Sequence, residues 1–266
     1  MQIPQSKFVA GIDAGSTAIK LVLYDGVHMG YWLCQAGWNP PEEARKLLET
    51  ATMQWRIKDT NIGLIYGTGY GRISLPYLNK AITEITCHAR GASFLHPGAR
   101  TVIDIGGQDA KAIRLDVQGN VSDFVMNDKC AAGTGRFIQV MAHALGLDLA
   151  ELATQSMSLE TACKINAMCT VFAESEVIGL INQGHSPRVI MAGIYQSIAK
   201  RVSVMAARID PCAPIVFSGG AAQHSTMRVA LEVELKSPIH VSDAAIYIGA
   251  IGAARLAWED MTKLNK

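Results

Sequence analysis

The sequence predicts an α/β fold of two lobes, in which one plan of the βββαβα type is duplicated. The first observation is an internal repeat: an apolar strand that ends in an aspartate and a glycine turn occurs at residues 9–17 and again at 102–111. The second is that each copy continues into two more short strands, while stretches with helical periodicity separate the later strands. The third is the length of 266 residues, which exceeds one small domain.

The first half contains further strands and one clear helix. Strands are expected at 19–24 and 28–34, on either side of an Asp-Gly turn. A helix is expected at 41–55, because it begins Pro-Glu-Glu and places its apolar side chains on one face. A buried strand at 62–66 follows. We expect the first lobe to comprise residues 1–99 together with 244–266.

The second half repeats the strands and adds more helices. Strands are expected at 112–115, 121–126 and 215–218, the last of which runs into Gly219 and Gly220. Apolar residues at three- and four-residue spacing predict helices at 136–145, 171–183, 188–208, 226–235 and 245–263. The second lobe is expected to span residues 100–243.

Composition narrows the class of protein. A net charge of +1 creates no field that would hold a polyanion, so nucleic acid is not an expected partner. Residues 1–7 lack the features of a secretion signal, and no apolar stretch is long enough to span a membrane. Six cysteines without a CxxC pair do not form a disulfide framework in a chain of this length. We therefore expect a cytoplasmic protein with no membrane partner.

Glycine turns that follow strands predict a site for nucleotide phosphates. Only glycine lets backbone N–H groups come close to an anion, and the turn at 132–135 opens directly into a helix, whose N-terminus favours phosphate. Asp13 and Asp104, one at each repeated strand end, are expected to hold the water shell of Mg²⁺. A single such turn is a weak signal, and the duplication strengthens it. The residues assigned to ATP or ADP are Gly15, Ser16, Thr17, Lys20, Gly106, Gly107, Gly133, Thr134, Gly135, Glu174, Gly219 and Gly220.

Other polar residues near these turns have two interpretations. Gln108 is assigned a catalytic role with the two aspartates, orienting water against the γ-phosphate, or else it is a turn side chain. Lys20 and Lys111 either reach phosphates or face solvent. Glu174 and Glu176 contact ribose or Mg²⁺, or they favour a helix start. No GxxxxGK[ST] motif occurs, and the glycines of GTGYG at 67–71 have the wrong spacing for a dinucleotide fingerprint.

Longer motifs carry a resemblance to a known family. They are GIDAGST, VIDIGGQDAK, NDKCAAGTGRF, MCTVFAESEV and FSGGAAQH. With these motifs the chain is similar to the ATP-hydrolysing activators of 2-hydroxyacyl-CoA dehydratases, in a family that includes the ATPase subunits of benzoyl-CoA reductases and the reductases of double-cubane cluster proteins. The resemblance covers nearly the whole chain and implies a two-lobed fold of the actin and sugar-kinase superfamily. The FSGGAAQH motif departs from the GGVAQN-like pattern of the family at Ala221 and His224.

The resemblance implies a homodimer with one [4Fe–4S] cluster at its interface. Two cysteines per chain would bind this cluster, and by motif they are Cys130 and Cys169. ATP hydrolysis in such proteins drives a low-potential electron into a partner iron–sulfur dehydratase or reductase, after a ferredoxin or flavodoxin has supplied it. An alternative implied by the same resemblance is an ATPase subunit of a benzoyl-CoA reductase complex.

Two further functions are compatible with the residues when the resemblance is set aside. A sugar or carboxylate kinase of the same superfamily would need no cluster and no cysteine motifs, and an actin-like filament former would polymerise with ATP. The remaining cysteines are expected to be small buried side chains, as lone cysteines usually are. They are Cys34, Cys87, Cys163 and Cys212, and Cys163 is the ambiguous one because it lies six residues before Cys169.

Overall fold

The computed structural model describes residues 8–166 and 169–264, which form two compact units. Unit 1 holds the chain up to residue 97, the turn 118–120 and the chain from residue 246 onward. Unit 2 holds residues 98–117 and 121–245. The segment 1–7, in which no secretion signal was found, and Met168, the first residue of the MCTVFAES motif, lie outside the described residues.

Unit 1 is built on a five-stranded sheet in the order β3-β2-β1-β4-β5. The first three strands form an antiparallel meander, and β4 runs parallel to β1. Strands β1 and β2 are buried along almost their whole length, which accounts for their continuous apolar sequences. The strands are β1 (Phe8–Ala14), β2 (Ala18–Tyr24), β3 (Met29–Gln35), β4 (Ile62–Thr68) and β5 (Lys80–Ala81).

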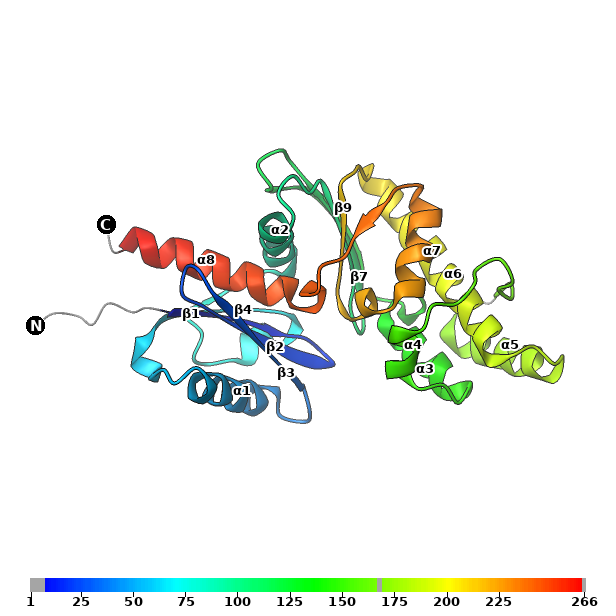
Figure 1. Cartoon of the computed structure of the whole chain (residues 1–266), viewed down its shortest axis with the longest axis horizontal. Coiled ribbons are helices and arrows are strands. Elements are labelled where there is room, and N and C mark those ends of the chain that lie inside the picture. Colours follow the sequence, from blue (N-terminus) through cyan, green and yellow to red (C-terminus); the bar gives the residue numbers. More distant parts are fainter. Residues whose placement is uncertain (1–7, 167–168, 265–266) are drawn as a thin grey trace, which may run out of the picture. The chain divides into compact units, whose positions relative to one another are not determined.

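Helices cover both faces of this sheet. Helix α1 (Pro40–Gln54) packs against β2 and β3, while α8 (Ile248–Leu264) packs against β1, β2 and β4. Figure 1 shows α1 and α8 on opposite sides of the blue strands. Helix α2 (Glu84–Leu95) packs along α8. Gly11 of β1 permits the close approach of α8, because a Cβ there would lie 2.1 Å from the carbonyl oxygen of Ala250.

Unit 2 repeats the sheet in the order β10-β9-β6-β7-β8. Strands β6, β7 and β8 form the antiparallel meander, and β9 runs parallel to β6 as β4 does to β1. The two sheets therefore share one topology, as the internal repeat predicts. The strands are β6 (Thr101–Ile105), β7 (Ala110–Leu115), β8 (Val121–Asn127), β9 (Ile215–Ser218) and β10 (Ile239–His240).

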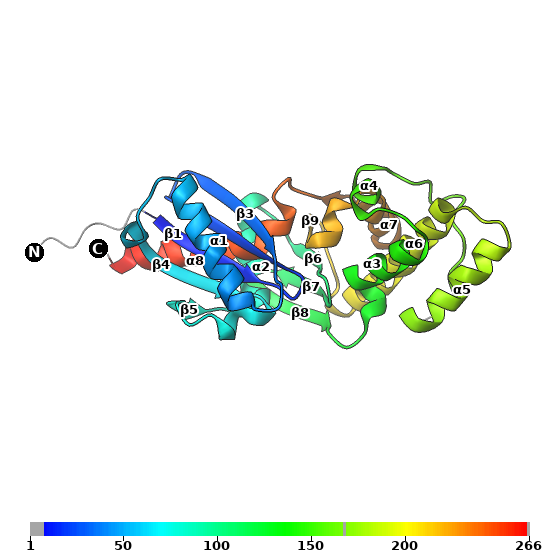
Figure 2. The same ribbon diagram turned by 90° about the horizontal axis from the view of Figure 1, so that it is seen from below.

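Five helices complete the described part of unit 2. Helix α6 contacts β7 and β8, and its buried Tyr195 packs in one core with Phe137 of α3 and Phe217 of β9. Figure 2 shows α3, α4, α6 and α7 gathered beside the sheet, with α5 at the outer end. The helices are α3 (Gly135–Ala144), α4 (Leu149–Thr154), α5 (Thr170–Asn182), α6 (Pro187–Ala206) and α7 (Ser225–Leu235).

The predicted α/β class of two repeated units is confirmed, and the predicted strands and helices form with small shifts of their ends. The predicted helix at 245–263 begins as a short 3₁₀ turn at Ala245–Tyr247 and becomes α8 only from Ile248. Sequence periodicity missed α2, in which Gly91 lowers helix propensity. Among the described residues, no helix is long and apolar enough to cross a membrane.

Candidate functional site

Asp13 ends the central strand of unit 1 between two polar neighbours. Across the β1–β2 pair it faces Lys20, and across the β1–β4 pair it faces Thr68. The ammonium Nζ of Lys20 lies 3.2 Å from Oδ2 of Asp13. Lys20 therefore holds the aspartate and does not simply face solvent. The other oxygen, Oδ1, faces Gly69, whose missing Cβ would lie 2.6 Å from it.

Asp104 has the same surroundings in unit 2. It faces Lys111 across β6–β7 and Ser218 across β6–β9. Nζ of Lys111 lies 3.2 Å from Oδ2 of Asp104 and 2.7 Å from Asp109, and Lys111 is almost fully buried. The Ser218 hydroxyl donates to Oδ1 of Asp104 over 2.7 Å. Oδ1 also faces the glycine that follows, since a Cβ on Gly219 would lie 2.8 Å from it.

The GTGYG segment at 67–71 is the unit 1 counterpart of the FSGG turn. Gly69 and Gly219 both have a φ of 89°, a backbone conformation that side chains rarely adopt, and both precede short 3₁₀ helices. Sequence reasoning noticed GTGYG only as a poor dinucleotide motif. Its alignment with 217–220 was the signal that would have identified it as part of the repeat.

The predicted phosphate turns lie at the ends of these strands. Ser16 and Thr17 are exposed in the β1–β2 hairpin, beside half-buried Gly15. Gly106 and Gly107 are half-buried in the β6–β7 hairpin, with Gln108 exposed at its tip. The exposed side chain of Gln108 can meet a ligand from solvent.

The phosphate turn of unit 2 is hydrogen-bonded to the segment that follows Cys130. The backbone N–H of Gly135 donates to the Gly106 carbonyl over 2.8 Å, and that of Arg136 donates to the Gly107 carbonyl over 2.9 Å. A Cβ on Gly135 would lie 3.0 Å from the same Gly106 oxygen, so glycine relieves a tight contact there. The two motifs therefore form one connected piece of backbone.

Thr134 supports this piece from inside. It is fully buried and forms the N-cap of α3, where its hydroxyl accepts from the Arg136 N–H over 3.3 Å. The same hydroxyl donates to the Ala131 carbonyl over 2.8 Å. Its proton is thus engaged within the turn. Gly133 beside it is also buried.

Cys130 and Cys169 are both exposed and both immediately precede helical segments. Cys130 begins the 3₁₀ turn Ala131–Gly133, and Asn127 holds its backbone by donating to its carbonyl and accepting from its N–H. Cys169 is the N-cap residue of α5, where its side chain makes no capping bond. Because α3 packs against α5, both cysteines belong to one helical group of unit 2.

The segment before Cys169 is fastened to neighbouring helices. The backbone N–H and side-chain amide of Asn166 donate to Glu176 on α5, so Glu176 holds the chain at Asn166. Glu174 is exposed on α5, which packs on α3 and α6. Gly193 of α6 lets the chain at Cys163 approach, because a Cβ there would lie 1.9 Å from the Cys163 oxygen.

The other four cysteines divide into two groups. Cys87 and Cys163 are buried as expected, and burial raises both thiol pKa values, that of Cys87 to about 12. Cys34 and Cys212 are only partly buried, which corrects the expectation of core side chains. Cys34 lies on the edge strand β3 and Cys212 in the loop before β9, where fewer neighbours cover a side chain.

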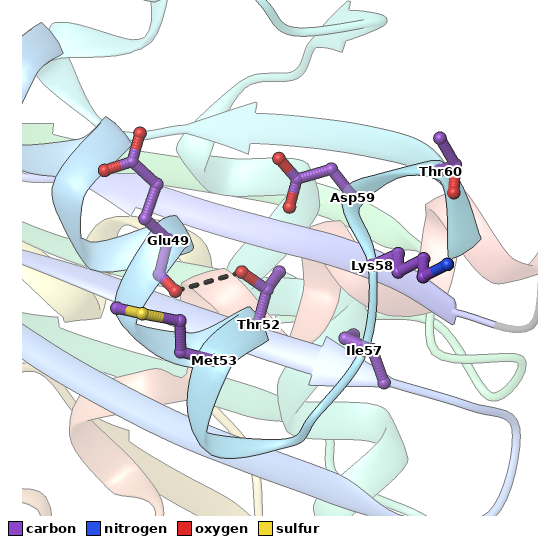
Figure 3. A pocket seen from close by; sticks show the side chains of 7 residues that line it. All are labelled: Glu49, Thr52, Met53, Ile57, Lys58, Asp59 and Thr60. Carbon is purple, nitrogen blue, oxygen red and sulfur yellow. Dashed lines mark hydrogen bonds between the residues drawn. The ribbon is translucent and has the colours of Figure 1, made fainter.

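A surface pocket in unit 1 lies away from these strand ends. Its lining comes from the second half of α1 and from the segment that leads into β4 (Figure 3). It is therefore at the amino end of the parallel strands, whereas Asp13 and Thr68 are at the carboxyl end, where α/β sheets bind ligands. In the described residues, no group of three or more His, Cys, Asp or Glu side chains is placed to hold a metal ion.

Comparison with known proteins agrees with this geometry. The model of the BadF/BadG/BcrA/BcrD ATPase family matches residues 10–257. The structure of component A of the (R)-2-hydroxyglutaryl-CoA dehydratase of Acidaminococcus fermentans is 40% identical, covers 97% of this chain and 100% of that chain, and has a TM-score of 0.91. The activator of the 2-hydroxyisocaproyl-CoA dehydratase from Clostridium difficile, solved with bound ADPNP, is 38% identical, with 97% of each chain covered and a TM-score of 0.88.

More distant matches extend the comparison. One of the subunits of the benzoyl-CoA reductase of Thauera aromatica is 32% identical over 92% of this chain and 91% of its own length. A glucokinase from Streptomyces griseus has a TM-score of 0.59 at 12% identity, covering 95% of this chain and 99% of its own, which shows the sugar-kinase-like fold alone. The repeated sheets, the paired aspartates and the family model together show that the chain belongs to the BadF/BadG/BcrA/BcrD ATPase family.

Proposed function

We propose that the chain is an ATP-hydrolysing activator that delivers single low-potential electrons to a partner iron–sulfur enzyme. The partner is a 2-hydroxyacyl-CoA dehydratase or a double-cubane cluster protein, and a ferredoxin or flavodoxin supplies the electron. Similarity to two dehydratase activators over nearly the whole chain supports this proposal. The observation that carries it is the pair of backbone hydrogen bonds from Gly135 and Arg136 to the Gly106-Gly107 turn.

The nucleotide is assigned to the repeated strand ends. Asp13 and Asp104 hold the water shell of Mg²⁺, which suits a cation that binds through few carboxylates and keeps its waters. Lys20 and Lys111 hold these carboxylates in place through ion pairs. Gln108, exposed beside the phosphate turn, orients the attacking water. The turns contribute backbone N–H groups to the phosphates, and Gly219 and Gly220 line the adenosine side.

The exposed thiols fit a shared iron–sulfur cluster. Cys130 and Cys169 supply two thiolates per chain, and a homodimer supplies the four that a [4Fe–4S] cluster takes. Each cysteine immediately precedes a helical segment, and the N-terminus of α5 carries a positive dipole end that favours an anionic group. When bound, the cluster supplies one-electron chemistry at low potential.

The chain's own backbone provides the coupling. Phosphate binding at Gly106 and Gly107 displaces the two carbonyls that accept from Gly135 and Arg136. Because Cys130 lies five residues before Gly135 on a segment braced by Asn127 and Thr134, a shift of the turn moves this cysteine directly. Nucleotide hydrolysis therefore biases the position of a thiolate without a long relay.

Iron analysis tests the thiol assignment. Protein purified without oxygen is expected to hold about two iron and two sulfide per chain, as one four-iron cluster per dimer requires. Cys130→Ser and Cys169→Ser are each expected to lose this iron while they still bind MgADP. Cys212→Ser is the matched control, since its thiol is half-buried and outside the proposed set. No iron in the wild-type protein after anaerobic reconstitution would point to a kinase, and a screen of phosphate acceptors would follow.

A second candidate function is that of an ATPase subunit in a benzoyl-CoA reductase complex. The 32% identity to a subunit of the Thauera aromatica reductase favours it. The mass of the native assembly separates the two, because an activator purifies as a homodimer and a reductase subunit purifies with different partner chains.

A further inference from the structure

The two repeated aspartates differ in one of the groups that hold them. Both have a lysine at Oδ2. In unit 2 the Ser218 hydroxyl also donates to Oδ1 of Asp104. In unit 1 Thr68 occupies the place of that serine, but its buried hydroxyl makes no hydrogen bond to Asp13. Asp13 therefore lacks the hydroxyl support that Asp104 has.

A histidine lies beside Asp13 on its other side. His88 belongs to α2 and is 6% exposed. The Cβ that Gly249 lacks would lie 3.0 Å from Nε2 of His88 and 3.3 Å from Oδ2 of Asp13. The imidazole and the carboxylate thus converge on this glycine in the first turn of α8. No function assigned above uses His88.

Close packing of α2 against α8 brings the imidazole to this place. A Cβ on Gly91 would lie 2.0 Å from the oxygen of Ile248, and a Cβ on Gly252 would lie 1.8 Å from the oxygen of Cys87. Only glycine permits two helix backbones to come this near. Because His88 directly follows Cys87, the contact that anchors Cys87 also determines where the imidazole lies.

We infer that His88 is a positioning residue for Asp13, and that its ring nitrogen holds the carboxylate in the orientation in which it binds Mg²⁺ and nucleotide. The inference rests on the proposed nucleotide role of Asp13. Groups that hold a metal-binding carboxylate determine how well it is placed, and their loss commonly lowers metal affinity or activity. In unit 2 a serine on the neighbouring strand supports the aspartate at Oδ1, whereas in unit 1 a histidine from a helix lies on the Oδ2 side.

The test compares two substitutions of the same residue. His88→Leu keeps the bulk of the side chain and removes its polar atoms, while His88→Gln keeps a polar group at similar reach. We expect His88→Leu to raise the Mg²⁺ concentration needed for half-maximal ATP hydrolysis, and for MgADP binding at equilibrium, by about 10–100-fold. His88→Gln is expected to recover most of this loss. Wild-type Mg²⁺ dependence in His88→Leu would overturn the inference.

Further variants keep the outcomes distinct. Gly249→Ala inserts a methyl group between the two side chains and is expected to reproduce the raised Mg²⁺ requirement, even where His88→Leu folds poorly. A fall in melting temperature with unchanged Mg²⁺ dependence in these variants would show a structural role only, which contradicts the inference. Asp13→Asn serves as the reference. If Asp13→Asn is also unchanged, the proposed nucleotide role of Asp13 itself fails; if it loses Mg²⁺-dependent binding while His88→Leu does not, only the role of His88 fails.

Discussion

The hydrogen bond from Ser218 to Asp104 allows a matched test of the repeat. Ser218 is 0% exposed and Asp104 is 2% exposed, and 2.7 Å separates the donor and acceptor oxygens. A hydrogen bond to a charged group contributes about 1.5–3 kcal/mol. Ser218→Ala is therefore expected to lower the free energy of unfolding of unit 2 by about 1.5–3 kcal/mol. The loss includes the desolvation cost of a carboxylate oxygen that keeps fewer partners.

Thr68→Val is the control that the duplicated fold offers. Thr68 occupies the same register position in unit 1, is equally buried, and makes no hydrogen bond to Asp13. Its replacement removes no hydrogen bond to a carboxylate, so it is expected to change stability by less than about 1 kcal/mol.

The two units can be followed separately during urea unfolding. All four tryptophans, at positions 32, 38, 55 and 258, belong to unit 1, so their fluorescence reports that unit. Hydrogen exchange of amides in β6 and β9 reports unit 2. The reasoning is refuted if Ser218→Ala leaves the protection of β6 unchanged, or if Thr68→Val destabilises its unit as much as Ser218→Ala destabilises the other.

Three more outcomes are expected. Asp104→Asn should lower ATP hydrolysis and electron delivery together by at least about tenfold, and unchanged hydrolysis would exclude a role at Mg²⁺. Burial lowers the pKa of His224, which hydrogen-bonds Tyr195 over 2.8 Å. The contribution of His224 to stability should therefore be complete above about pH 6.5 and fall at lower pH, where the unfolded chain takes up a proton. In His224→Asn the melting temperature should fall less steeply as the pH is lowered below about 6.5. A pH profile equal to that of the wild type would contradict this. Gly252→Ala, with a Cβ 1.8 Å from a carbonyl of α2, should cost about 1–3 kcal/mol, whereas Gly179→Ala, which meets nothing within 4 Å, should not destabilise in the same melt.

Local sequence was sufficient to predict most of the framework. Short apolar runs that end in an aspartate and a glycine turn produce the same hairpins wherever they occur, so the repeat at Asp13 and Asp104 was visible without coordinates. Helix α2 was not predicted, because Gly91 in its interior lowers helix propensity. Packing against α8 stabilises this helix. The likeness of the Thr68-Gly69 turn to the Ser218-Gly219 turn was missed because the sequences share only a hydroxyl residue followed by glycine, while the φ of the glycine and the strand register, which show the likeness clearly, come from the structure.

For the candidate site residues, too, sequence identified some features and the structure was needed for others. The motifs around Cys130 and Cys169 singled out these two thiols among six, and the structure finds both exposed. Sequence could not show that the Thr134 hydroxyl donates to the Ala131 carbonyl or that Glu176 accepts from Asn166, because hydrogen-bond partners depend on the folded path of the chain.

The sequence by itself determined the α/β class, the duplicated strand-and-turn plan and the residue types at each strand end, since these depend on interactions between near neighbours along the chain. Tertiary structure alone decided which groups surround each aspartate. Ser218 reaches Asp104 only because β9 pairs with β6, and His88 reaches the side of Asp13 only because glycines let α2 and α8 pack closely. Such contacts join residues far apart in the chain, and their geometry is set by packing, which leaves no periodic trace in the sequence.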